Sequence, residues 1–218
     1  MALEAILFGS IGTIVETSEL QRAAFNKAFA EHNLDWNWDR ETYRRRLASS
    51  GGTDRISAFA LEQGATVDVE AIHAAKTRIF DADIITASLE PRSGVLEVIR
   101  SARGEGLKLG FVTSTSRNNI EAIFTALGNT LTEDDFDFVG DSSMVENSKP
   151  APDIYLEALT SLDIPAENAI AIEDSEPSLL AAAEAHIRCI AFPGENTLNQ
   201  DFSLAEVITT SLTLTIFR

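Results

Sequence analysis

The sequence contains a single cysteine, few basic residues and no long hydrophobic run. Because Cys189 has no second cysteine to pair with, no disulfide can form within the chain, which is typical of a reducing compartment. The apolar stretches Leu107–Val112 and Ala169–Ile172 are strand-sized, well short of the roughly 20 residues that a membrane-spanning helix needs. The first apolar run, which ends at Phe8, has no basic segment before it and does not resemble a secretion signal. We therefore expect a cytoplasmic protein that has no membrane partner.

Basic residues are outnumbered two to one, with 17 Lys and Arg against 34 Asp and Glu and a net charge of −17. This charge repels the phosphates of nucleic acids, and the short run Arg44–Arg46 does not reverse it, so we expect no nucleic acid partner. The same charge opposes any phosphorylated ligand at long range, so an anion site needs a nearby Lys, Arg or metal ion. The sequence identifies no protein partner. The histidines lack the spacing of metal ligands and stand at His32, His73 and His186.

Residues 18–86 show the periodicity of helices and almost no strand-like run. Ser18 and Gln21 have the spacing of a capping box at the start of a first helix, and Asp39 is a candidate start for a second. The segment Ser49–Thr53 is typical of a turn. We predict that residues 16–87 form a helical cap domain inserted into a core domain made of residues 1–15 and 88–218.

From about residue 90, strands alternate with helices, which is typical of a parallel sheet covered by helices on both faces. The fold class is therefore α/β, with an all-helical insertion after the first strand. The tail Ala205–Phe217 is rich in Thr, Ile and Leu and is a candidate edge strand. The strands expected after the first one are Leu107–Val112, Phe136–Val139, Ala169–Ile172 and Cys189–Phe192.

Polar residues follow several of the predicted strands, at the sheet edge where ligands of such folds bind. Thr113 and Ser114 follow one strand, Lys149 precedes a predicted helix, and Glu173 and Asp174 follow another strand. Each has a simpler structural explanation, since Ser114 could cap a helix, Lys149 could be a surface lysine and the acidic pair could be a solvated turn. Their order and their common placement together favour a functional site.

In this order of motifs the chain resembles the haloacid dehalogenase superfamily, and within it the CbbY-like and beta-phosphoglucomutase-like subgroup. The resemblance also rests on the helical insertion, on Ser50–Arg55 and on Lys149–Tyr155. It implies a Rossmann-like core and magnesium-dependent hydrolysis of phosphate esters. In such proteins the first motif reads Asp-x-Asp-Gly-Thr, where the first Asp attacks phosphorus and the second protonates the leaving group and activates water.

The resemblance assigns a role to each later motif. Ser114, with Thr113 as an alternative register, and Lys149 match the groups that bind the phosphoryl group, and Glu173 and Asp174 match the magnesium ligands. The implied ligand is a small phosphorylated metabolite such as a sugar phosphate. Further candidates for binding it are the backbone amides around Ile11 and Gly12 and the side chains of Arg55, Ser116, Arg117 and Asn118.

The first motif departs from the family pattern at both catalytic positions. Gly9 stands in place of the nucleophile and Ile11 in place of the acid and base, and neither carries a titratable group. We expect weak magnesium binding and a pseudophosphatase that binds a phosphosugar or phosphate. Two alternatives stay open. One is a hydrolase with a rearranged site, in which Glu16 replaces the missing groups or a metal held by Glu173 or Asp174 activates water, and the other is an interaction protein with a relic pocket. Catalytic aspartates are sometimes replaced deliberately to trap a substrate, but Gly and Ile are not isosteric replacements for Asp. The two residues therefore favour a natural sequence over an engineered one.

Overall fold

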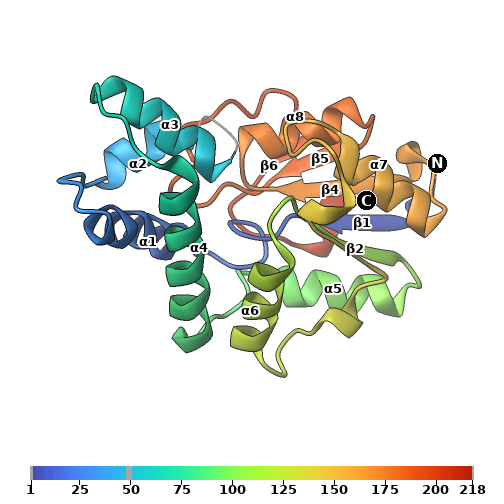
Figure 1. Ribbon diagram of the computed structural model, residues 1–218. Helices are drawn as coiled ribbons and strands as arrows, with labels where there is room; N and C mark the ends of the chain where they lie inside the picture. The colour runs from blue at the N-terminus through green and yellow to red at the C-terminus, as the bar shows by residue number, and fades with distance from the viewer. Residues whose placement is uncertain (1, 48–50, 218) are drawn as a thin grey trace.

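The computed structural model describes residues 2–47 and 51–217 and has one parallel β-sheet with helices packed around it (Figure 1). Within these residues the sheet has six strands in the order β3-β2-β1-β4-β5-β6, and every neighbouring pair is parallel. The predicted α/β fold is confirmed. The strands are β1 (Ala5–Phe8), β2 (Lys108–Val112), β3 (Phe138–Gly140), β4 (Ala169–Glu173), β5 (Arg188–Ala191) and β6 (Val207–Ile208).

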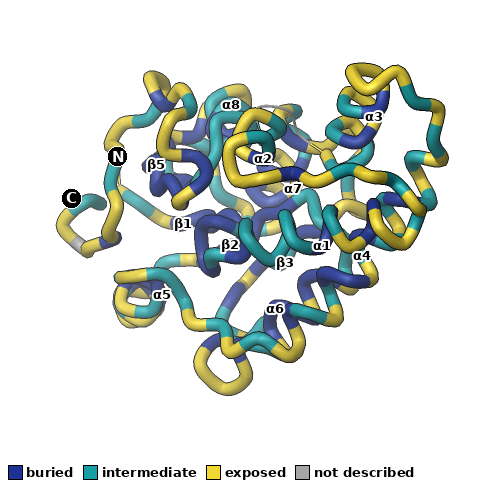
Figure 2. Tube along the Cα trace, turned by 90° about the vertical axis from the view of Figure 1, so that its left-hand side faces the viewer, coloured by how far each residue is buried: buried dark blue, intermediate teal, exposed yellow. Residues whose placement is uncertain are grey.

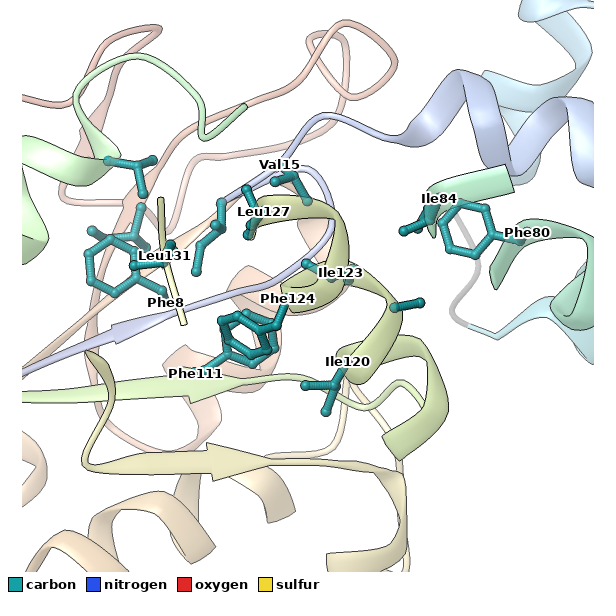
Figure 3. Close-up of a cluster of buried hydrophobic side chains, with 14 of the residues drawn as sticks. Phe8, Val15, Phe80, Ile84, Phe111, Ile120, Ile123, Phe124, Leu127 and Leu131 are labelled. Carbon is teal, nitrogen blue, oxygen red and sulfur yellow. The ribbon is translucent and has the colours of Figure 1, made fainter. Parts of the chain in front are cut away.

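The two faces of the sheet carry side chains of different size. Bulky residues such as Phe8 and Phe111 face α5 (Val95–Gly104) and α6 (Arg117–Leu127). Small residues such as Ala171 face α7 (Asp153–Leu162) and α8 (Glu176–Glu184). Figure 3 shows Phe124 of α6 beside Phe111, with the ring centroids 5.1 Å apart. Burial of these side chains, dark blue along β1 and β2 in Figure 2, is the main source of the fold's stability.

The part of the chain that follows β1 and precedes α5 forms four helices, which make up a separate layer on the left of Figure 1. An aromatic cluster holds this layer together, in which Trp38 lies 4.7 Å from Phe25 and 4.9 Å from Phe29 between ring centroids. Phe80 and Ile84 of the last helix lie on the far side of α6 in Figure 3, and this helix joins the layer to the core. The helices are α1 (Ser18–Glu31), α2 (Arg40–Arg46), α3 (Gly52–Glu62) and α4 (Val69–Thr86).

Two of the four helix starts in this layer have a side-chain capping bond, from Asp39 at α2 and from Asp68 at α4. Asp39 accepts a hydrogen bond from the Thr42 amide at 2.7 Å, which confirms the predicted start of α2. The predicted capping box at Ser18 is wrong, because the Glu16 carboxylate accepts from both the amide and the hydroxyl of Ser18. The residue before Ser18, Thr17, is the N-cap and makes no side-chain capping bond.

Three predicted boundaries differ from the structure. The expected turn at Ser49–Thr53 is wrong at Gly52 and Thr53, which already belong to α3, while Ser49 and Ser50 lie outside the described residues. The predicted strand at Phe136 begins two residues later, because the Asp137 carboxylate accepts from the Leu109 amide at 2.8 Å. The tail does add an edge strand, β6, but over two residues only.

Candidate functional site

A pocket of about 1170 Å³ lies between the carboxyl ends of the strands and the helical layer. Most of the residues singled out in the sequence line it, because parallel strands end at the same edge of the sheet. The lining from the core includes Ser10, Ile11, Gly12, Thr113, Ser114, Ser116, Asn118, Lys149, Glu173 and Asp174. The lining from the helical layer includes Gln21, Tyr43, Arg55, His73, Lys76, Phe80 and Asp81.

Lys149 and Glu173 form a buried ion pair at the floor of the pocket. The Lys149 ammonium donates to Glu173 and, at 2.9 Å, to the backbone oxygen of Val112. The Tyr155 hydroxyl donates to the same Glu173 oxygen. Since Lys149 and Glu173 are 8% and 1% exposed, these extra hydrogen bonds offset part of the cost of removing both charges from water. One oxygen of Glu173 is thus fully engaged within the protein.

The second oxygen of Glu173 occupies the space beside Gly9. A β-carbon at position 9 would overlap the Glu173 carboxylate and would lie 2.8 Å from the Thr13 hydroxyl. The Thr13 hydroxyl is buried and has no hydrogen-bond partner among the described residues. A side-chain acceptor at position 9 would reach this hydroxyl, and Gly9 supplies none. Its desolvation without a partner costs about 1–3 kcal/mol.

The loop after Gly9 is held by its own backbone. Ile11 forms a β-bridge with Val15, and the Gly12 amide donates to the Val15 oxygen at 2.7 Å. Of the backbone amides predicted to bind phosphate around Ile11 and Gly12, that of Gly12 is thus engaged within the loop. Gly12 has φ +84°, and a β-carbon there would overlap the Asp174 carboxylate. Burial, with smaller contributions from the charges of Glu173 and Glu16, raises the pKa of Asp174 to about 8.

The hydroxyl residues after β2 divide between the pocket and the helix. Ser114 accepts a hydrogen bond from the Lys149 amide at 3.2 Å, and Thr113 accepts one from the Thr115 amide at 3.2 Å. The N-cap of α6 is Ser116, whose side chain accepts from the Asn119 amide. Ser114 therefore lies beside Lys149 and does not cap the helix.

Two of the predicted substrate-binding residues have contrasting positions. Arg55 lies in α3 on the helical side of the pocket, where its Nε donates to the Arg46 backbone oxygen at 3.2 Å. Arg117 does not line the pocket, and its guanidinium forms ion pairs with Glu121 and Glu133. Spacing along the chain did not indicate the ion pair with Glu133, which lies sixteen residues away.

Glu16, the possible substitute carboxylate, is also engaged. It lines the mouth of the pocket, where its oxygens accept from the Ser18 amide at 3.0 Å and the Glu195 amide at 3.3 Å. No hydrogen bond or ion pair between described residues joins Glu16 to Lys149. These contacts fix Glu16 at the junction of the helical layer and the core.

Lys76 is a pocket residue that the sequence did not point to, because it lies in the apolar periodicity of α4. It is 8% exposed, and its ammonium lies 4.7 Å from the ring centroid of Phe80 and 5.1 Å from that of Phe25. Burial, and then the nearby Arg55 charge, lowers the pKa of Lys76 to about 8. That shift corresponds to about 3 kcal/mol against the charged form.

The residues at the sheet edge do not fit a resident magnesium ion. Within residues 2–47 and 51–217, no three His, Cys, Asp or Glu side chains gather as a metal-binding group. Gly9 and Ile11 supply no side-chain oxygen, and Glu173 is engaged by Lys149 and Tyr155. The other acidic residue at this edge, Asp174, has a pKa raised to about 8 by burial, so at neutral pH it is mostly protonated and is a poor ligand for a cation that is held through carboxylates.

Every helix within residues 2–47 and 51–217 is too short or too polar to span a membrane.

Comparisons with known proteins agree with this architecture. The chain is 42% identical over 207 residues to the protein CbbY of Cereibacter sphaeroides, covering 94% of this chain and 90% of that one. It is similar to the crystal structure of CbbY from Rhodobacter sphaeroides in complex with phosphate, with a TM-score of 0.88, 41% identity and coverage of 96% and 94%. A substituted form of that protein in complex with xylulose-(1,5)bisphosphate gives the same values. The family model for haloacid dehalogenase-like hydrolases matches residues 6–192, and the chain belongs to this family.

Proposed function

We propose that this protein binds a phosphorylated sugar in the pocket and does not hydrolyse it efficiently. The observation that carries this proposal is the position of Glu173, which fills the space beside Gly9 and pairs with Lys149. In this proposal Ser114 and Lys149 hold a phosphate, and positions 9 and 11 supply no carboxylate that could attack one. In this proposal residues 16–87 form the cap over a core made of residues 1–15 and 88–218.

The binding half of the proposal rests on Ser114, Lys149 and Arg55. A lysine ammonium and a serine hydroxyl on the core side can donate to a phosphate, and hydrogen bonds from charged donors are about twice as strong as neutral ones. Arg55 on the helical side is a cation for a second anionic group. A relative binds xylulose-(1,5)bisphosphate, which has a phosphate at each end, and a sugar bisphosphate is the ligand class that we propose here.

The proposed absence of efficient hydrolysis rests on the residues at positions 9 and 11. Glu173 is set deeper than the carboxylate of an aspartate at position 9, because its oxygen lies where only the β-carbon of that aspartate would be. Although Glu173 lines the pocket, its carboxylate is thus set back from the position of an attacking carboxylate. Ile11 cannot transfer a proton, and general acid or base catalysis contributes roughly 10²–10⁴-fold to such reactions. The loss of both groups removes the two-step route.

Magnesium is not required for binding in this proposal. A carboxylate at position 9 and another at position 11 would add two negative charges that a divalent cation could neutralise. With Gly9 and Ile11 these charges are gone, and Lys149 provides the local positive charge for a phosphate. The chemistry of the remaining donors thus suits an anion held by a lysine and hydroxyl groups.

The test is a thermal melting experiment with inorganic phosphate and a sugar bisphosphate. A ligand at 100 times its Kd adds about 2.7 kcal/mol to the free energy of unfolding. For a protein of this size that corresponds to a rise in Tm of about 5–10 °C. Lys149→Met should abolish the rise, and Lys108→Met, which removes an exposed lysine on β2, should leave it unchanged. The absence of any rise with the natural protein would contradict the proposal.

A further inference from the structure

Lys76 has an environment that differs from that of the other lysines in the chain. The four lysines are Lys27, Lys76, Lys108 and Lys149. Three of them, Lys27, Lys108 and Lys149, each form an ion pair with a carboxylate. Among the described residues, no carboxylate lies within ion-pair distance of Lys76. The Lys76 side chain is buried within the helical layer and lines the pocket.

The neighbours of Lys76 disfavour a permanent positive charge on it. The faces of Phe25 and Phe80 enclose the amine, and Arg55 of α3 adds a like charge. The negative group that acts on Lys76 is Asp81, five residues further along α4, whose carboxylate accepts a hydrogen bond from the Asn119 side chain at 2.8 Å. An amine that is desolvated beside another cation is the usual form of a nucleophilic lysine.

We infer that Lys76 condenses reversibly with the free carbonyl group of an open-chain sugar phosphate in the pocket. This rests on the proposed function for the identity of the occupant. The lone pair of Nζ attacks the carbonyl carbon, and the carbonyl oxygen takes up the proton that the nitrogen releases. Loss of water from this carbinolamine gives an imine, and water reverses the step. No oxidant or reductant takes part.

The ligand class fits this chemistry. A five-carbon ketose that carries phosphate on both terminal hydroxyls cannot close into a ring, because the hydroxyl that would attack the carbonyl is esterified. Its ketone therefore stays free. With one phosphate near Lys149 on the core side and the other near Arg55, the carbonyl lies in the interior of the pocket, which Lys76 lines. A protein without a phosphatase nucleophile would hold such a sugar covalently.

The experiment traps the imine on the natural protein. The full chain is incubated at pH 8 with glycolaldehyde phosphate and sodium cyanoborohydride, and each lysine-containing peptide is followed by mass spectrometry. About half of Lys76 is neutral at this pH, compared with well under 1% of an exposed lysine. We expect Lys76 to gain the label at least about tenfold faster than Lys27 and Lys108. Lys76→Arg, which keeps the charge and removes the nucleophile, should lose this label, and Lys27→Arg should not affect it.

Two further measurements separate this inference from the proposed function. Glycolaldehyde without phosphate should label Lys76 more slowly than the phosphorylated aldehyde, and inorganic phosphate should raise the Tm. If phosphate raises the Tm but Lys76 is labelled no faster than Lys27, the imine is overturned and phosphate binding stands. If both aldehydes label Lys76 equally fast and phosphate does not change the Tm, the sugar phosphate is overturned as the ligand, together with the proposed function.

Discussion

Replacing Gly9 with aspartate would bring a second carboxylate into the space that Glu173 occupies. The new β-carbon overlaps the Glu173 carboxylate, so Glu173 must rotate away from Lys149 and Tyr155. Breaking a buried ion pair costs about 3–5 kcal/mol. The new carboxylate recovers part of this, since it gives the Thr13 hydroxyl a partner worth about 0.5–1.5 kcal/mol. It also lies close enough to Lys149 to replace part of the lost pair.

We therefore predict that Gly9→Asp lowers the free energy of unfolding by about 2–3 kcal/mol. Urea denaturation measures this directly, and the Tm should fall by about 4–10 °C. Gly104→Asp is the matched control, because nothing lies within 4 Å of a β-carbon there, and its effect should stay within about 0.5 kcal/mol.

A double-mutant cycle with Glu173→Ala completes the test. The cost of Gly9→Asp should shrink by at least about 1 kcal/mol when Glu173 is already truncated, because the overlap is gone. If Gly9→Asp costs no more than Gly104→Asp, or if the cost is the same in both backgrounds, Glu173 does not occupy the space beside Gly9.

The remaining predictions concern a lysine, an arginine and the metal. Lys76→Met should stabilise the protein by about 1–3 kcal/mol at pH 7, because it removes a buried ammonium whose unfavourable burial exceeds its attraction to two aromatic rings. The folded-state pKa of Lys76 is lowered to about 8, so the natural protein gains stability as pH rises from 8 to 10.5. Urea denaturation at pH 7 and pH 10 should show the difference between the two proteins shrinking, and a constant difference would contradict the shift. Arg92→Met should cost about 2–4 kcal/mol by calorimetry, since its guanidinium donates to the backbone oxygens of Gly12, Phe192 and Pro193; a loss under 1 kcal/mol would contradict this. In a calorimetric titration, magnesium and EDTA should each change the Kd for phosphate less than twofold, whereas a tenfold effect would mean that a metal completes the site.

The sequence was sufficient to predict the sheet and the convergence of its polar ends. Lys149, Ser114 and Glu173 come from distant segments, and they meet because each lies at or beyond the end of a parallel strand and these strands end at the same edge. Hydrophobic patterning fixes such strands within a residue or two, as at β4 and β5.

Side-chain direction could not be predicted in the same way. Arg117 sits at the expected place along the chain, but Glu133 draws it away from the pocket. Lys76 has helical spacing with Ile72 and Phe80 and was hidden within an apolar pattern. The capping box at Ser18 failed because Glu16 competes for the same amide. Each of these outcomes depends on which side chains meet in space, and spacing along the chain does not encode this.

The central claim is that the pocket binds a sugar bisphosphate without hydrolysing it. Phosphorus NMR of such a sugar, mixed with the natural protein and magnesium, measures both properties in one sample. We predict that the phosphate signals broaden or shift on binding and that no inorganic phosphate signal grows above the protein-free control. Accumulation of inorganic phosphate at about 1 s⁻¹ or faster, within the ordinary range of enzymes, and its loss in Lys149→Met would contradict the claim.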